Sequence, residues 1–223
     1  MSDFALNAGQ VENLFKDRDG GYRFSRWGRE IAPVVFGVDD DTLGHLKDAM
    51  AEVMLIANME FAETDPELGA NLMFFFCTDW DELDMVPNLD KLLPDFEILK
   101  SSLKRSGANQ YRSFSFDDNG AIKVCIVLLR FDEHMAETTI QTLGVGQMAQ
   151  CILLWGDDAF DGVTPIAIVP QSAMCVVKPN FAAVIRAAYD PTMPPSSADN
   201  SHAMRLAARA ELILEELEDM NDA

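Results

Sequence analysis

The run Asn71–Cys77 (NLMFFFC) constrains the fold of this chain more than any other segment. It follows Gly69 and is too short for a typical buried helix, so it predicts a strand that is buried on both faces. The segment Ala121–Phe131 (AIKVCIVLLRF) has a similar apolar character and predicts a second, central strand. The sequence therefore predicts a β-sheet at the centre of the fold.

A strand and a long helix are predicted before this run. Ile31–Val38 (IAPVVFGV) is strand-like, and Pro33 favours a place at the edge of the sheet or at the start of the strand. The acidic residues Asp39–Asp41 and Thr42 are typical of a helix N-terminus, where they cap free N–H groups and complement the helix dipole. The apolar residues that follow recur at helical spacings of three and four: Leu43, Leu46, Met50, Val53, Met54, Ala57 and Phe61.

The middle of the chain contains a predicted hairpin. Tyr111–Phe116 and Ala121–Phe131 are strand-like, and the connector between them ends in Asn119-Gly120, a strong hairpin signal. Before the hairpin, a helical stripe is formed by Leu92, Phe96, Leu99 and Leu103.

Helices dominate the rest of the chain. Residues 133–155 predict a helix that Gly156 would end in a left-handed conformation, and a shorter helix is expected at about 180–189. The order of strands and helices predicts an α+β fold, with a mixed sheet and the long helices packed on one face.

Polar segments divide the chain into three predicted parts. Residues 1–25 contain many polar residues and glycines, so they predict a flexible N-terminal arm, and residues 26–195 form the α+β domain. Residues 196–223 hold the end of a proline- and serine-rich linker and a C-terminal amphipathic helix at about 202–220. The apolar stripe of that helix must be buried on its own domain, on a second copy in a homodimer, or on another partner.

The charge of the chain bears on which partners it can bind. It has 37 acidic and 17 basic residues and a formal net charge of -20. Such a charge disfavours binding to nucleic acid or to an anionic membrane. It is compatible with a generally acidic, soluble protein, or with an acidic surface that attracts a basic protein partner.

The sequence predicts a cytoplasmic protein. No stretch approaches the ~20 apolar residues of a membrane helix, and the N-terminus lacks the regions of a secretory signal. The four cysteines are far apart among apolar neighbours, as is typical of buried thiols in a reducing compartment: Cys77, Cys125, Cys151 and Cys175.

The segment Gly146–Asp158 has the residue spacing of a zinc-peptidase active-site helix, but it lacks the metal-ligating and catalytic side chains. Such a helix carries His, Glu and His at relative positions one, two and five, which supply two metal ligands and a general base. Here those positions hold Gly146, Gln147 and Gln150. Glycine has no donor side chain, and a neutral glutamine amide cannot act as a base. The sequence therefore predicts neither a catalytic residue nor a bound metal or cofactor.

Three segments in shared order resemble an uncharacterised bacterial family of zincin-like proteins, whose active-site helix reads Glu-Glu-x-x-Gln. They are Ala70–Phe76, Gly146–Asp158 and Val184–Pro191, the last similar to the family's Leu-Arg-x-Leu-Tyr-Asp-Pro. The resemblance implies a zincin-like fold from about Phe24 to Pro195. This chain departs from the family because the carboxylates of the active-site helix are also missing.

Other metal sites lack a complete ligand set. A third histidine of the metzincin type would stand at Gly156, while His45 and His202 are expected on the surface and His134 has no nearby partner. The segment GDDAFDG fails the EF-hand pattern and predicts a solvated turn that contains Asp157, Asp158 and Asp161.

The function expected from these features is binding rather than catalysis. Gln147, Gln150 and Tyr189 are the residues expected to line a vacated cleft, where a sheet edge could bind an extended protein or peptide segment. Two alternatives stay open: a hydrolase that uses the same cleft without a standard zinc site, and an acidic antagonist of a basic protein. The two glutamines could equally be ordinary polar helix residues.

Overall fold

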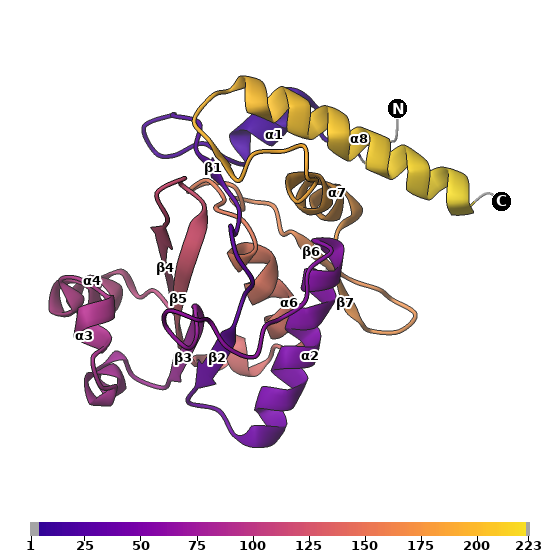
Figure 1. The fold of residues 1–223 in the computed structure, drawn as a ribbon. Coiled ribbons are helices and arrows are strands. Elements are labelled where there is room, and N and C mark those ends of the chain that lie inside the picture. The colour runs from indigo at the N-terminus through magenta and orange to yellow at the C-terminus, as the bar shows by residue number, and fades with distance from the viewer. Residues whose placement is uncertain (1–4, 222–223) are drawn as a thin grey trace.

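The structure is a computed structural model that describes residues 5–221, except the side chains of His134, Met220 and Asn221. Its centre is a four-stranded sheet in the order β2 (Pro33–Phe36), β3 (Leu72–Cys77), β5 (Ile122–Arg130), β4 (Gln110–Phe116) (Figure 1). The first three strands are parallel and β4 is antiparallel to β5. The predicted mixed sheet and α+β class are therefore confirmed, and β2 and β4 form the two edges.

Helices and short strands surround this sheet. Two small ribbons accompany it, because β1 pairs with β8 and β6 pairs with β7, both antiparallel. The remaining elements are α1 (Ala8–Asn13), β1 (Phe24–Ser25), α2 (Asp40–Ile56), the 3₁₀ helix η1 (Trp80–Met85), α3 (Leu89–Leu92), α4 (Phe96–Ser106), α5 (Glu133–Ala136), α6 (Ile140–Cys151), β6 (Ile166–Ile168), β7 (Cys175–Val177), α7 (Pro179–Ala188), β8 (Ser196–Ser197) and α8 (Ser201–Asn221).

Both faces of the sheet are covered. All six residues of β3 are buried, and they alternate between two apolar clusters. Leu72 and Phe74 belong to the large cluster that includes α2, α6, α7 and α8, whereas Met73 and Phe75 belong to a smaller cluster with η1, α3 and α4. The long helices α2 and α6 do share one face, as predicted, but shorter helices cover the other.

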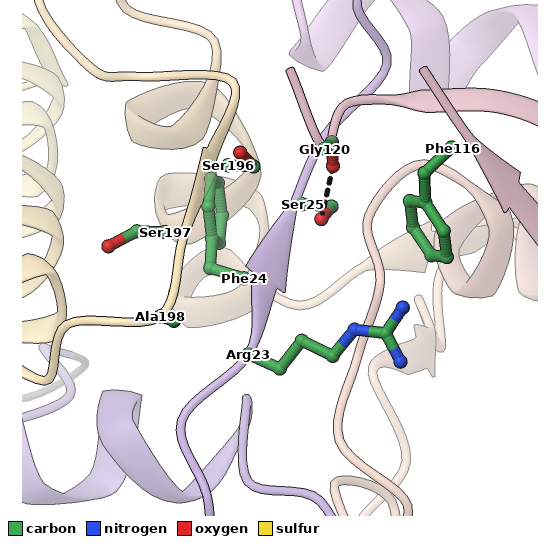
Figure 2. Close-up of a pocket in the computed structure, with 8 residues that line it drawn as sticks. All are labelled: Arg23, Phe24, Ser25, Phe116, Gly120, Ser196, Ser197 and Ala198. Carbon is green, nitrogen blue, oxygen red and sulfur yellow. Dashed lines mark hydrogen bonds between the residues drawn. The ribbon is translucent and has the colours of Figure 1, made fainter. Parts of the chain in front are cut away.

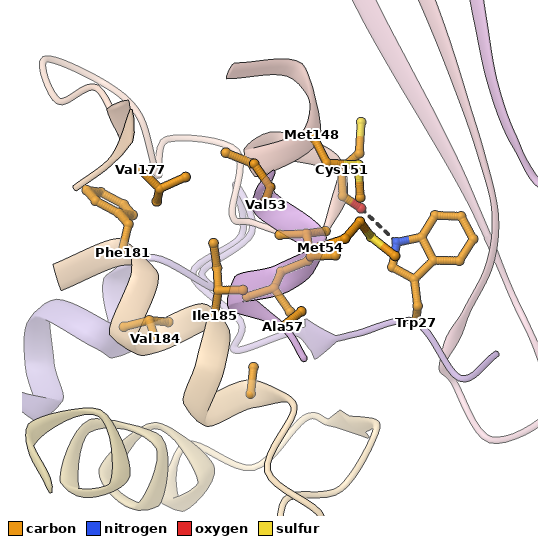
Figure 3. Close-up of a cluster of buried hydrophobic side chains, with 14 of the residues drawn as sticks. Trp27, Val53, Met54, Ala57, Met148, Cys151, Val177, Phe181, Val184 and Ile185 are labelled. Atoms are coloured by element: carbon orange, nitrogen blue, oxygen red, sulfur yellow. Dashed lines mark hydrogen bonds between the residues drawn. The ribbon is translucent and has the colours of Figure 1, made fainter. Parts of the chain in front are cut away.

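The large cluster forms where α2, α6 and α7 meet behind the sheet, and Figure 3 shows its centre. The two helices α2 and α6 approach closely at Gly144, because a Cβ there would lie 2.7 Å from the Ala49 Cβ. The side chain of Trp27 also enters this cluster, although it precedes the first strand of the sheet.

Several local predictions are confirmed. Asp39 caps α2 by accepting a hydrogen bond from the Thr42 N–H at 2.9 Å, and Pro33 begins the edge strand β2. The hairpin of β4 and β5 turns through Gly120, whose φ of 76° requires the freedom of glycine.

The single helix predicted at 133–155 is wrong. The chain leaves helical geometry after α5, and Thr139 caps a new helix, α6, by accepting a hydrogen bond from the Thr142 N–H. Helix α6 ends at Cys151, before the predicted end. Gly156 does not have a positive φ, so it does not end a helix in a left-handed conformation.

Gly156 instead permits a close crossing of two chain segments. A Cβ at this position would lie 2.2 Å from the backbone oxygen of Lys16, and the Gly156 N–H donates to the Leu14 oxygen at 2.7 Å. The glycine is required because the N-terminal segment passes directly against it.

The predicted flexible arm at residues 1–25 is therefore wrong for its described part, residues 5–25. Helix α1 begins with a capping box between Asn7 and Gln10, and Val11 and Phe15 are fully buried. Phe15 also stacks on Trp155 with ring centroids 5.3 Å apart. The apolar residues of this segment contribute to the main core, and residues 1–4 lie outside the described part.

The C-terminal helix packs on its own domain. Helix α8 lies against α1 and α7 and buries Leu206, Ala210, Ile213 and Leu214. The preceding linker is ordered by the ion pair of Asp190 with Arg209 at 2.8 Å and by the pairing of β8 with β1. Leu217 is 49% exposed, and association of two copies through this helix stays a prediction. No helix in the described part has the length and apolar character needed to cross a membrane.

A buried histidine ties α8 to the N-terminal segment. His202, expected on the surface, is fully buried, and its ring centroid lies 4.2 Å from that of Phe24 in a tilted arrangement. The Tyr22 hydroxyl lies 2.7 Å from His202 Nδ1, and His202 Nε2 has no partner among the described residues. Burial, with a smaller contribution from the nearby charge of Arg205, lowers the pKa of His202 to about 4.

This histidine should make folding sensitive to mild acid. The unfolded chain binds a proton near pH 6.5 and the folded chain only near pH 4, so stability is lost as pH falls through that window. A shift of this size corresponds to about 3 kcal/mol in the free energy of unfolding. Urea unfolding of the wild type and of His202→Asn at several pH values measures it. The Asn amide oxygen can still accept from Tyr22, so identical pH profiles for the two proteins would refute the prediction.

Candidate functional site

The predicted active-site frame lies within α6, so residues 146–150 are helical. Gln147 is only 5% exposed, and its side chain reaches the edge strand β4. The Arg112 guanidinium donates a hydrogen bond to Gln147 Oε1, and Gln147 Nε2 donates to Gln110 Oε1 at 3.3 Å. Arg112 also donates to the same Gln110 oxygen at 3.3 Å. These three side chains form a polar cluster, the Arg112 cluster, at the junction of α6 and β4.

Two buried thiols lie behind the Arg112 cluster. Cys125 and Cys151 are free and fully buried. Burial raises the pKa of Cys125, and its interaction with Cys151 adds to this effect. The prediction of buried thiols is confirmed. The Nε atom of Arg112 has no partner among the described residues, so the guanidinium retains a free donor.

The backbone of β4 presents an unpaired edge beside this cluster. The Arg130 N–H donates to the Asn109 oxygen at 2.8 Å, which marks a hydrogen-bonded pair with β5. Because such pairs alternate along antiparallel strands, the backbone groups of Gln110, Arg112 and Phe114 point away from β5. No described residue outside the sheet bonds to these groups. The strand therefore offers a row of backbone donors and acceptors to an extended chain.

The three predicted cleft residues do not converge. Only Gln147 faces β4. Gln150 is half-buried, and its amide donates back to the Gly146 oxygen of its own helix at 3.2 Å. The Tyr189 hydroxyl donates to the Ile152 backbone oxygen at 2.8 Å and accepts from the backbone N–H of Trp27 at 3.3 Å. Burial raises the pKa of Tyr189. Tyr189 thus supports the fold at the end of α6.

The end of α6 is held by aromatic side chains, which the sequence did not reveal. The last carbonyl groups of a helix lack partners within the helix. Here side-chain donors replace a glycine cap, each at 2.8 Å: Trp155 Nε1 to the Ala149 oxygen, Trp27 Nε1 to the Cys151 oxygen, and Tyr189 Oη to the Ile152 oxygen. These bonds fix the helix end, and with it the position of Gln147.

A pocket of about 290 Å³ lies near the turn of the β4–β5 hairpin and is lined by that turn and by the paired strands β1 and β8 (Figure 2). The hydroxyl groups of Ser25 and Ser196 in this pocket already donate hydrogen bonds to backbone oxygens of the protein. Ser25 donates to the Gly120 oxygen at 2.8 Å, and Ser196 donates to the Asn119 oxygen. The Arg23 guanidinium lies over the Phe116 ring, 4.6 Å from its centroid. These contacts attach the turn of the hairpin to β1 and β8, and so they help to fix the position of the edge strand β4.

The residues considered for metal binding are dispersed. Among the described residues, no three His, Cys, Asp or Glu side chains are grouped so that they could hold a metal ion. His45 is exposed beside Asp41, and the side chain of His134 lies outside the described ones. Asp157 is exposed and accepts a hydrogen bond from the Arg18 N–H at 3.1 Å.

No protein-family model, curated protein or solved structure matches this chain.

Proposed function

We propose that this protein binds an extended peptide segment along the free edge of β4, on a zincin-like scaffold that lacks catalytic residues. The observation that carries this proposal is the outward-facing backbone of Gln110, Arg112 and Phe114 beside the Arg112 cluster. An added strand would complete these hydrogen bonds, and pockets for alternate side chains would supply specificity.

The position of Gln147 supports the zincin-like part of the proposal. It occupies the general-base position of the frame and faces the strand edge along which a peptide would lie. In a zinc peptidase, a glutamate there would take a proton from water. A glutamine amide cannot, and it is already bonded to Arg112 and Gln110. The site can therefore hold a peptide without cutting it.

The Arg112 cluster supplies the polar chemistry of this site. The guanidinium is oriented by Gln147 and Gln110 at the edge of β4, so it places a positive charge beside the added segment. Phe114 lies on the same face of the strand as Arg112, and it packs against the large cluster. A bound segment would therefore meet a polar and an apolar subsite on alternate residues.

A pair of substitutions at one position tests the backbone contribution. Arg112→Ala removes the guanidinium but keeps the outward N–H, whereas Arg112→Pro removes both. Because this N–H does not bond to β5, proline is tolerated at the edge. We expect Arg112→Pro to bind about five- to tenfold more weakly than Arg112→Ala, the cost of about one unmade hydrogen bond.

The probe is a display library of random peptides, about eight residues long to match a strand, selected on the wild-type protein. Affinities of the selected peptides are measured by calorimetry, with urea unfolding to confirm that both variants fold. Equal affinities for the Pro and Ala variants would contradict strand addition. Cleavage of the peptides would favour the hydrolase alternative. Binding restricted to basic peptides and abolished by salt would favour the acidic antagonist.

A further inference from the structure

A second cavity lies at the carboxyl ends of the parallel strands and shares no residue with the Arg112 cluster. It has a volume of about 240 Å³ and is lined mainly by apolar side chains, among them Leu46, Phe76, Phe131, Met135, Ile140 and Leu143. Its two hydroxyl-bearing residues are Thr42 and Thr138. Among the described residues, no charged side chain lines it.

The order of the connections after the parallel strands explains why a cavity forms at this end of the sheet. After β2 the chain turns to α2 on one face, and after β3 it turns to η1 on the other face. Crevices for ligands form where such connections leave the carboxyl ends of strands in opposite directions. The exit of β5, which leads through α5 into α6, closes the same end (Figure 1).

Gly37 shapes the wall between β2 and β3. Its φ is 86°, and a Cβ at this position would lie 2.1 Å from the Phe76 oxygen. Because glycine has no Cβ, the backbone after β2 can contact the backbone at the end of β3. Val38 and Thr42, which follow Gly37, then line the cavity. At the mouth, Phe131 is 37% exposed and its ring lies 5.7 Å from the Phe76 ring.

The size of the cavity sets the size of its ligand. An apolar cavity of about 150 Å³ accommodates benzene. By proportion, a cavity of this volume accommodates an apolar molecule of about ten heavy atoms. The Thr42 hydroxyl donates to Asp39 at 3.0 Å, so it can only accept a hydrogen bond from a ligand.

The charges around the cavity set the polarity of its ligand. Asp39 accepts from the Thr42 N–H at 2.9 Å, and Asp132 accepts from the Met135 N–H at 2.8 Å. Each carboxylate is therefore directly bonded to a residue that lines the cavity. An anionic ligand would lie near these like charges and would lose its hydration inside the cavity.

We propose that this cavity binds a small, uncharged, apolar molecule of about ten heavy atoms. The proposal does not depend on peptide binding at β4, because the two sites share no residues. It assigns the ligand by chemical class: a medium-chain alcohol or a compact aromatic fits, whereas a fatty acid of the same length does not.

Octanol is the test probe and octanoate is its charged counterpart. Methyl-labelled methionine places one reporter in the cavity, Met135, and one on the exposed surface of α8, Met204. We expect octanol to shift the NMR signal of Met135 and not that of Met204. Octanoate should bind at least about tenfold more weakly, since its carboxylate would be desolvated beside acidic residues.

Two variants distinguish this cavity from other apolar surfaces. Ala136→Leu fills the cavity from an exposed position, so it should abolish the Met135 shift while the protein stays folded. Leu143→Ala enlarges the cavity and should favour decanol over octanol. Ala208→Leu on α8 is the matched control and should change nothing. The proposal is overturned if octanol leaves Met135 unshifted, if Ala136→Leu binds it as the wild type does, or if octanoate binds equally well.

Discussion

Replacing Trp27 with alanine is expected to lower the free energy of unfolding by about 3–5 kcal/mol, the range for a buried tryptophan. The indole is 1% exposed within the large cluster, and its N–H donates to the Cys151 oxygen at 2.8 Å (Figure 3). The substitution removes apolar contacts and also leaves a carbonyl group at the end of α6 unbonded. Such a loss is a large fraction of the stability of a typical domain.

Urea unfolding of Trp27→Ala and of Trp27→Phe separates the two contributions. Phenylalanine keeps most of the buried surface and loses only the hydrogen bond, so its cost should be about 1–3 kcal/mol. If phenylalanine were as damaging as alanine, hydrogen bonding would account for the whole effect. If alanine cost less than about 1 kcal/mol, Trp27 would not hold the end of α6.

Replacing Gly156 with alanine is expected to cost about 3 kcal/mol, at the upper end of overpacking effects. The new Cβ would lie 2.2 Å from the Lys16 oxygen and 2.8 Å from the Lys16 nitrogen, and both are backbone atoms. The N-terminal segment must move away, so the bond from the Gly156 N–H to Leu14 should weaken as well. Hydrogen exchange should then accelerate at Arg23, whose N–H donates to the Phe15 oxygen.

Gly44→Ala is the matched control for this substitution. Gly44 lies inside α2, and apart from the helix's own backbone no described atom lies within 4 Å of the position of its Cβ. Alanine there should stabilise the protein by up to about 1 kcal/mol through helix propensity. Wild-type stability and unchanged exchange in Gly156→Ala would show that the crossing of the two segments tolerates a side chain.

Elements with strong local signals were predictable from the sequence. The apolar run of β3, the capping residue Asp39 of α2 and the Gly120 turn of the hairpin each determine local structure through residues close in sequence. Pro33 also predicted its place at the sheet edge, because a proline cannot donate to a neighbouring strand.

The packing of the N-terminal segment was not predictable in this way. Val11 and Phe15 are four residues apart and Tyr22 and Phe24 are two apart, but each pair is too short to give a reliable pattern, and polar residues and glycines lie between them. Their partners, such as Trp155 and His202, lie more than a hundred residues away. The burial of these residues arises only in the tertiary structure, which a local pattern does not encode.

The candidate site was predictable only in part. The frame of the zinc-peptidase helix located Gln147, but not its partner Arg112, because the packing of α6 against β4 is set by tertiary contacts. Tyr189 was expected in a cleft on the basis of a family resemblance. It instead bonds the end of α6, which lacks a glycine cap and therefore needs other donors for its carbonyl groups.

The bond between Tyr22 and His202 joins residues 180 positions apart in sequence. Contacts of such high sequence separation slow folding, because a long loop must close before they form. During synthesis on the ribosome, the side chains of Phe15 and Phe24 stay partly exposed until α8 has left the exit tunnel and can pack in the same cluster. A nascent chain arrested before His202 should therefore expose an apolar N-terminal surface that chaperones bind. Once the last helix is released and packs, this surface should be buried and chaperone binding should end.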